Sequence, residues 1–152
     1  MNVLGIRCSN TDYAYVILTG NRAAPEIVEK SLIALPKGYS RSESLKWFYQ
    51  EIDGILGRVA INTITIKGAE ALAARDQSFV SRVENEAMIF LAASNRGLEN
   101  ISRKVKVTIA KDLGGKGKAK YLAQLDTSVF PNYAQETDKI KEAILAAWSS
   151  IP

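Results

Sequence analysis

The sequence predicts an α/β fold: a mixed five-stranded sheet, made of a three-stranded antiparallel meander and two parallel strands, with helices on both faces. Three observations predict it. Three β-rich segments separated by short polar turns come first, two long segments with helical periodicity follow, and an extended segment comes after each of those helices. A chain of 152 residues, 47% of them hydrophobic, can bury the core of one domain spanning residues 1–152.

Three strands are expected at the start of the chain. Residues 1–8 are an apolar run, residues 12–20 are rich in β-branched and aromatic side chains, and residues 25–35 alternate between apolar and polar. Because the intervening turns are short, these strands are expected to form an antiparallel meander. The only cysteine, Cys8, lies in the first strand and is expected to be a buried small hydrophobic residue.

The first long helix is expected to begin near Ser42, because apolar residues then recur at spacings of three and four. Ser42 or Ser44 is the expected N-cap. The apolar residues on its shared face are Leu45, Phe48, Ile52, Ile55, Leu56 and Val59. Residues 61–68 then predict a short buried strand that ends at Gly68.

A second long helix is expected over residues 77–95, with Gly97 as its stop signal. Its core-facing residues are expected to be Phe79, Val83, Ala87, Phe90, Leu91 and Ser94. Residues 103–110 predict a fifth strand. Because parallel strands are joined by helical crossovers, the fourth and fifth strands are expected to lie parallel to the first. The final helix is expected over residues 136–149, with Trp148 in the core.

The composition excludes several classes of catalyst. The chain has no histidine, which removes Ser-His and Cys-His hydrolases and histidine-based metal sites. Its net charge of +4 is compatible with a nucleic-acid partner. No apolar run reaches the roughly 20 residues of a membrane-spanning helix, and the first strand lacks the features of a secretory signal. We therefore expect a soluble, cytoplasmic protein with no membrane partner.

Four stretches of the chain, VLGIRCSN with YAYVIL, ITIKGAE, AKDLGGKGKAK and TDKIKEAILAAW, carry a likeness to a known family. Together with the order of elements, they resemble the ribonuclease H-like superfamily and, within it, the RuvC-type crossover-junction resolvases. The resemblance implies a ribonuclease H-like fold. It also relates the chain to enzymes that hold two divalent metal ions on three or four carboxylates and cleave phosphodiesters.

The chain departs from that family at its metal-binding positions. The resemblance places the family's first acid in an opening GID pattern, where this chain has Arg7, and the second at the end of the fourth strand, where it has Lys67. The last acids lie on the closing helix, where Glu142 matches best and Asp138 lies one turn earlier. Because two cations repel a metal ion, the resemblance implies degenerate catalytic acids, with no catalytic residue, no metal and no other cofactor.

Two interpretations of Arg7 and Lys67 remain open. Both are expected near the carboxyl ends of neighbouring strands, where α/β sheets bind ligands, and there they would form an anion site for a phosphate. In the second interpretation they pair with Glu142 or Glu70 and hold the last helix to the sheet as an ionic latch. The need of buried charges for partners favours the latch.

A metal-dependent, structure-selective nuclease with atypical acidic ligands is the alternative to a non-catalytic protein. Its carboxylates would be Asp12, Glu70, Asp138 and Glu142, and its cofactor would be Mg²⁺. These acids are scattered along the chain, whereas a two-metal site needs ions about 4 Å apart. The non-catalytic interpretation is therefore preferred.

The stretch KDLGGKGKAKY predicts a contact with nucleic acid. Glycines let backbone N–H groups approach an anion, and lysines release counterions from a phosphate backbone. The expected contact residues, which include the counterpart of the family's G-x-G-x-A loop, are Lys111, Lys116, Lys118, Lys120, Gly115 and Gly117. A mobile, solvated surface turn is the alternative interpretation.

The sequence thus predicts a non-catalytic nucleic-acid-associated or accessory protein that contacts a DNA or RNA backbone. A nuclease and a protein-interaction domain remain the alternatives. Trp47 and Tyr49 lie beside the apolar face of the first long helix and predict a subunit contact, and hence a homodimer.

Overall fold

The computed structural model describes residues 1–152 and contains a five-stranded mixed sheet with the strand order β3-β2-β1-β4-β5. The first three strands pair antiparallel, and β4 and β5 continue the sheet parallel to β1. The strands are β1 (Val3–Cys8), β2 (Asp12–Gly20), β3 (Pro25–Ala34), β4 (Thr63–Lys67) and β5 (Ile101–Lys104). The expected meander with two parallel strands beyond it is confirmed.

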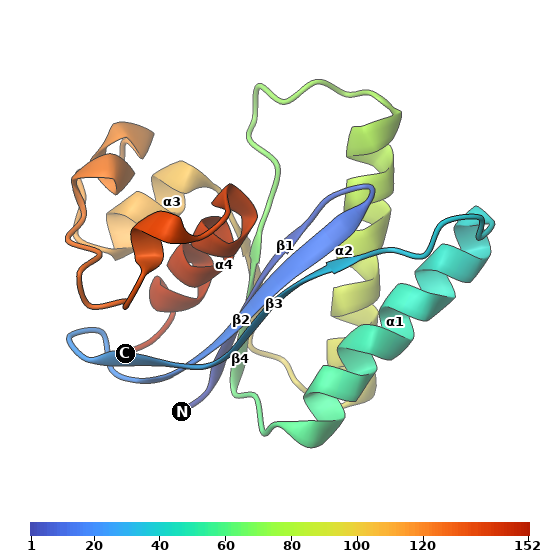
Figure 1. Ribbon diagram of the computed structural model, residues 1–152, viewed down its shortest axis with the longest axis horizontal. Coiled ribbons are helices and arrows are strands. Elements are labelled where there is room, and N and C mark those ends of the chain that lie inside the picture. Colours follow the sequence, from blue (N-terminus) through green and yellow to red (C-terminus); the bar gives the residue numbers. More distant parts are fainter.

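Helices cover both faces of this sheet, as expected (Figure 1). The long helices α1 (Arg41–Arg58) and α2 (Gln77–Asn95) lie together on one face. The helices α3 (Lys106–Asp112) and α4 (Asp138–Trp148) lie on the other face. Two short 3₁₀ helices, η1 (Ala119–Gln124) and η2 (Tyr133–Gln135), connect α3 to α4.

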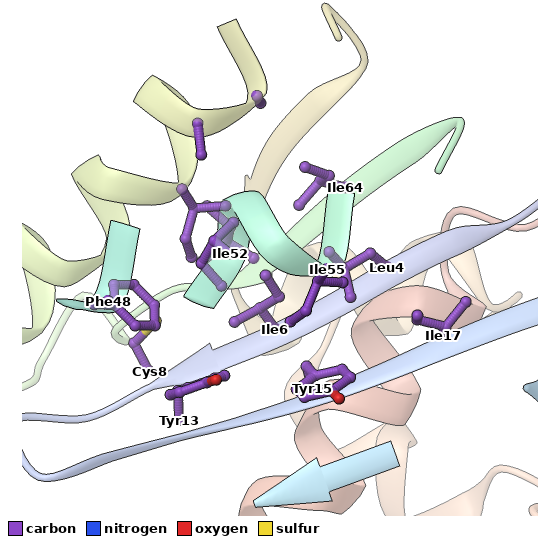
Figure 2. Close-up of a cluster of buried hydrophobic side chains, with 14 of the residues drawn as sticks. Leu4, Ile6, Cys8, Tyr13, Tyr15, Ile17, Phe48, Ile52, Ile55 and Ile64 are labelled. Atoms are coloured by element: carbon purple, nitrogen blue, oxygen red, sulfur yellow. The ribbon is translucent and has the colours of Figure 1, made fainter. Parts of the chain in front are cut away.

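Alternation along β1 divides its side chains between two hydrophobic layers. Leu4, Ile6 and Cys8 point toward α1 and α2, and Figure 2 shows them facing Phe48 and Ile52 of α1. Val3, on the opposite face, packs in the α4 layer. The burial of Cys8 is confirmed, since its side chain has no exposed surface.

Gly5 allows α4 to approach the sheet closely. A Cβ atom at this position would lie 2.1 Å from the carbonyl oxygen of Ala143 and 2.8 Å from the amide nitrogen of Ala147. Any side chain larger than hydrogen would therefore push the helix away. At the end of the same helix, Trp148 is buried, and its Nε1 donates to the carbonyl oxygen of Arg22, so the predicted core position of Trp148 is confirmed.

The N-cap of α1 is Ser40, so the prediction of Ser42 or Ser44 is wrong. The Ser40 hydroxyl accepts from the amide of Glu43, and the Glu43 carboxylate accepts from the amide of Ser40. This reciprocal pair satisfies two N–H groups at once, which a cap at Ser42 or Ser44 does not offer.

The bounds predicted for α2 are confirmed, and Gly97, with φ of 68°, follows its end in the left-handed conformation. The predicted core face of α2 is wrong. Val83 and Leu91 are exposed, whereas the fully buried positions are Asn85, Glu86, Ile89, Ala92 and Ala93. Two apolar stripes share this helix, and the one that is buried contains a carboxylate and an amide with partners elsewhere in the chain.

The fifth strand is shorter than the predicted segment 103–110. It pairs with β4 only as far as Lys67 opposite Lys104, where β4 itself ends. Beyond that point no strand is available for pairing, and the chain turns into α3, which buries Ile109 and Ala110 in the α4 layer. The alternating pattern of this segment therefore belongs partly to a strand and partly to a helix.

Candidate functional site

The carboxyl ends of β1 and β4 bring Arg7 and Lys67 to the same edge and the same face of the sheet. The parallel register places Ile6 opposite Ile66, so Arg7 and Lys67 follow as neighbours. Since Ile6 and Ile66 face α1 and α2, the two cations face α4. The predicted position of both residues at the strand ends is confirmed.

Arg7 is paired with the last helix. Its Nε lies 2.8 Å from Oε2 of Glu142 on α4, and its Nη1 donates to the carbonyl oxygen of Cys8. The two charged side chains are about one-fifth to one-quarter exposed, at 19% and 24%. This ion pair connects the end of β1 to α4.

Lys67 is almost completely buried, with 3% of its side chain exposed, and it has two oxygen partners. Its Nζ lies 2.7 Å from the carbonyl oxygen of Gly68 and 2.7 Å from Oε1 of Glu70. Glu70 Oε1 also accepts from the amide of Lys106 at the start of α3. Glu70 thus joins the end of β4 to the beginning of α3.

The pKa of Glu70 reflects these partners. Partial burial acts to raise it, but the hydrogen bonds from Lys67 and from the Lys106 amide, with the positive charges of both residues, outweigh burial. The pKa of Glu70 therefore lies below its ordinary value. This carboxylate is held in its charged form by its surroundings.

The acids proposed for an alternative metal site are distributed among separate partners. Asp12, at the start of β2, receives both hydrogen bonds of Lys139 Nζ, at 2.6 and 2.7 Å. Asp138 is exposed on the first turn of α4, and it lines the same groove as Glu142, as expected for residues one turn apart. No three carboxylate or thiol side chains converge within metal-binding reach.

A buried carboxylate that sequence reasoning missed lies behind this edge. Glu86 of α2 has no exposed surface, and its Oε1 lies 2.7 Å from Nε of Arg103 on β5. Its Oε2 lies 3.4 Å from Nε of Arg82, and neither of these two atoms has a hydrogen-bond partner. A glutamate one turn after an arginine is an ordinary pattern on an exposed helix face, so the sequence carried no signal of its burial.

Arg82 also reaches the strand ends. Its Nη2 donates to the carbonyl oxygen of Lys67 at 2.7 Å. The pKa of Arg82 is lowered, first by burial and then by the positive charge of Arg7, against the opposing effect of Glu86 and Glu142. Arg82 therefore lies close both to the end of β4 and to the charge of Arg7.

The glycine- and lysine-rich segment lies on the surface between α3 and η1. Lys111, Lys116, Lys118 and Lys120 are all exposed. The backbone turns at Gly114 and Gly117, with φ of 88° and 71°. The amide of Gly115 donates to the carbonyl oxygen of Ala110, which anchors the start of the turn to α3.

A groove lies beside η1 and α4 and includes Glu142 of the strand-end site. It has a volume of about 510 Å³ and is lined by residues of α3, η1 and α4, among them Lys106, Ala119, Lys141 and Glu142. Glu142 is also the partner of Arg7. The groove therefore includes the carboxylate partner of Arg7 and the residue that follows Lys118, whereas none of the four lysines of the turn lines it.

The aromatic residues beside the apolar face of α1 contact this chain's own core. Trp47 packs edge-to-face on Tyr13, with ring centroids 6.2 Å apart, and Tyr49 accepts a hydrogen bond from Asn95 of α2. Both are partly buried. The homodimer predicted from them stays a prediction.

None of the helices is both long enough and apolar enough to pass through a lipid bilayer.

The fold resembles those of solved resolvases. Thermus thermophilus RuvC in complex with a Holliday junction substrate superposes with a TM-score of 0.81 at 15% identity, over 98% of this chain and 92% of that one. The yeast mitochondrial Holliday junction resolvase matches with a TM-score of 0.60 at 14% identity, over 97% of this chain and 77% of that one. No protein-family model and no curated protein matches the sequence.

At these identities the likeness establishes the fold. The mixed five-stranded sheet with its helices superposes over almost the whole chain on the Thermus structure. The chain has the ribonuclease H-like fold in the form found in RuvC and related Holliday junction resolvases.

Proposed function

We propose that this chain is a non-catalytic nucleic-acid-binding protein built on a resolvase-like scaffold. The observation that carries the proposal is the occupation of the two strand ends by Arg7 and Lys67, each with its own carboxylate partner. The resemblance to RuvC-type resolvases implies metal-binding acids at these two positions. The chain therefore keeps the two strand-end positions of that site and carries positive side chains where the resemblance implies negative ones.

A pair of divalent ions does not fit the side chains present at this edge. Magnesium requires oxygen ligands in near-octahedral geometry, and guanidinium and ammonium groups offer none. Glu70 and Glu142 are the carboxylates paired with Lys67 and Arg7, so each is already engaged with a cation. A metal ion would have to displace Lys67, which is buried, and Arg7, both of which would then lose their carboxylate partners.

The binding surface proposed for nucleic acid is the lysine-bearing turn together with the groove beside it. The four exposed lysines of the turn form no ion pair, whereas the cations at the strand ends do. Unpaired surface lysines are suited to phosphate contacts that neutralise the backbone and release counterions. The Thermus resolvase was solved in complex with a Holliday junction substrate, so a four-way junction is the first substrate to test.

The proposal predicts junction binding that weakens steeply with salt. Replacing Lys116 and Lys118 by alanine should reduce the slope of log K against log salt by about 1–2, because each lost phosphate contact contributes about 0.9. The matched control is the double variant Lys37→Ala with Lys46→Ala. It removes the same charge from a residue just before α1 and from a residue on α1. An equal loss of slope in both double variants would contradict the assignment of the turn.

The second candidate is a metal-dependent nuclease with atypical ligands, favoured by the groove that Asp138 and Glu142 share and by the likeness to resolvases. It requires junction cleavage that appears with Mg²⁺ or Mn²⁺ and disappears in Glu142→Gln. A chain that binds no nucleic acid and forms a stable oligomer at micromolar concentration would instead support a protein-interaction domain.

A further inference from the structure

A pocket that neither the lysine-bearing turn nor the ion pairs explain opens beside Arg7. Its volume is about 280 Å³, and it lies between the turn after β1, the segment after β4 and the start of α2. Arg7 and Arg82 are its cationic lining residues, and three alanines of the segment after β4 form part of its wall. Lys67 does not line the pocket, because its ammonium group is turned to Gly68 and Glu70.

Both arginines have hydrogen-bonding capacity to spare. Arg7 uses Nε for Glu142 and Nη1 for Cys8, and its Nη2 forms no hydrogen bond within the chain. Arg82 uses Nη2 for the carbonyl oxygen of Lys67, and its Nη1 forms none. Neither of the two unused nitrogens is among the fully buried polar atoms, so both are accessible to a ligand.

The charge of Arg82 is incompletely compensated. Glu86 is its only ion-pair partner, at 3.4 Å and without a hydrogen bond, and Glu86 makes its shorter contact, at 2.7 Å, with Arg103. With 13% of its side chain exposed, Arg82 has little water to replace a partner. A buried, under-compensated cation beside a second cation favours an anion from solution.

The remaining polar groups of the pocket suit an anion as well. Asn10 Nδ2 donates to Ser78 Oγ at 3.2 Å, which leaves the Ser78 hydroxyl hydrogen free to donate. The one carboxylate in the lining, Asp76, is engaged as the N-cap of α2, where its Oδ1 accepts from the amide of Phe79. The lining therefore contains two guanidinium groups and one carboxylate, of which Oδ1 is engaged with a backbone amide.

We propose that this pocket binds a phosphate group through the guanidinium groups of Arg7 and Arg82, with Ser78 as a further donor. A tetrahedral oxyanion with several acceptor oxygens matches planar guanidinium donors, which bind phosphate through two parallel hydrogen bonds. Binding of the phosphate group stands on the pocket alone. The further inference that this phosphate group belongs to a bound nucleic-acid strand rests on the proposed function.

The first test titrates inorganic phosphate into the whole chain at constant ionic strength and follows backbone amide NMR shifts and thermal unfolding. Saturable shifts at Asn10, Ser78 and Phe79, together with a rise in Tm, are expected, because a ligand of the folded state stabilises it. Chloride at the same ionic strength is the control. The absence of saturable shifts at these residues up to tens of millimolar, on the order of the weakest useful affinities, overturns the proposal.

A charge variant keeps the test independent of folding. Ser78→Glu places a carboxylate at the pocket mouth in the first turn of α2, where an acid is favourable to the helix, so the variant is expected to fold. It should weaken phosphate at least about tenfold through like-charge repulsion. Gln77→Glu adds the same charge in the same turn at a residue that does not line the pocket. Equal affinities in the two variants contradict the proposal.

Arg82→Gln gives the complementary loss of a donor. It should weaken phosphate by about tenfold or more, as expected for a hydrogen bond to a charged group. The control Arg75→Gln removes the same charge from an exposed residue close in the chain, whose guanidinium lies over the ring of Phe79 and outside the pocket lining. If both variants lose phosphate affinity to the same extent, general charge explains the binding and the pocket assignment is wrong.

A second measurement, binding of a four-way junction, distinguishes the two sources of the phosphate. If Ser78→Glu weakens both inorganic phosphate and a four-way junction relative to Gln77→Glu, the pocket holds a phosphate of the strand. If it weakens inorganic phosphate alone, the pocket is supported as a site for a free phosphate. A chain that binds phosphate and no junction refutes the proposed function while leaving this site in place.

Discussion

Replacing Glu86 by glutamine removes the negative charge on which two arginines depend. The Glu86 side chain is 1% exposed, lies 2.7 Å from Arg103 and 3.4 Å from Arg82, and is the only carboxylate paired with either. Glutamine has nearly the same shape, so the substitution tests the charge rather than the packing. It also tests the reason why this face of α2 is the buried one.

The cost follows from the exposure of the two partners. Breaking a buried ion pair costs about 3–5 kcal/mol when the remaining charge stays buried. Arg103, 42% exposed, regains water, whereas Arg82, 13% exposed, does not. We therefore expect Glu86→Gln to lower the free energy of unfolding by about 2–3 kcal/mol, at or just below the lower end of that range. For a chain of this size the melting temperature should fall by about 4–12 °C.

Urea unfolding of the wild type and Glu86→Gln, followed by far-UV circular dichroism, measures this difference. Glu84→Gln is the matched control, because Glu84 lies on the same helix, is 38% exposed, and pairs with Arg41 only at 3.6 Å. That control should change stability by less than about 1 kcal/mol. A Glu86→Gln variant as stable as the wild type would refute the reasoning, since the arginines would then not need the carboxylate.

Two further predictions concern the sheet and its ion pairs. Gly5→Ala should lower the free energy of unfolding by about 3 kcal/mol or more in the same urea assay. The added methyl group would meet the backbone of Ala143, which cannot move aside as a side chain can. A loss below about 1 kcal/mol would contradict this prediction, because α4 would then be free to shift. The pKa values of Asp12 and Glu70 are lowered in the folded chain. Their ion pairs therefore contribute stability above the ordinary carboxyl pKa of about 4, and this contribution is lost as the pH falls through the lowered pKa values of the folded state. The urea midpoint should therefore decline below about pH 4 in the wild type and decline less in Asp12→Asn, and an equal decline in both would contradict this assignment for Asp12.

The sheet could be predicted from sequence because its pattern is local. Residues 12–20 combine β-branched and aromatic side chains without interruption, and β2 has those bounds. The position of β4 and β5 beyond the meander followed from the helices that precede each of them. In these segments, local propensity and tertiary pairing favour the same state.

The segment 103–110 shows where such reasoning stops. Its alternation of lysine with valine and its β-branched residues favour a strand throughout. The end of the strand is set by its neighbour, because β4 stops at Lys67 and offers no partner beyond Lys104. That limit is a property of the sheet, and it is not written in the segment itself.

The N-cap of α1 could have been found from the sequence. Ser40 and Glu43 stand three residues apart before an apolar-periodic stretch, which is the signature of a capping box. The buried face of α2 could not be found from the sequence. The stripe predicted to be buried was the more hydrophobic of the two, whereas the true core face contains Glu86. The burial of that carboxylate depends on its ion pair with Arg103, which lies on another element.

The candidate site could be predicted in outline. The resemblance placed Arg7 and Lys67 at adjacent strand ends, and the structure has them there with carboxylate neighbours. The role of Arg82 was not visible, because nothing in its local sequence shows that α2 directs it toward the end of β4. The pocket between these elements exists only in three dimensions.

The proposed loss of metal-dependent cleavage is tested most directly by one measurement. The chain is incubated with a labelled four-way junction in Mg²⁺ or Mn²⁺, and binding and strand cleavage are read from the same samples. The account predicts a salt-sensitive complex whose DNA strands stay intact over hours. Cleavage that requires the metal and is abolished in Glu142→Gln would contradict it, because Arg7 and Lys67 would then sit beside working metal ions.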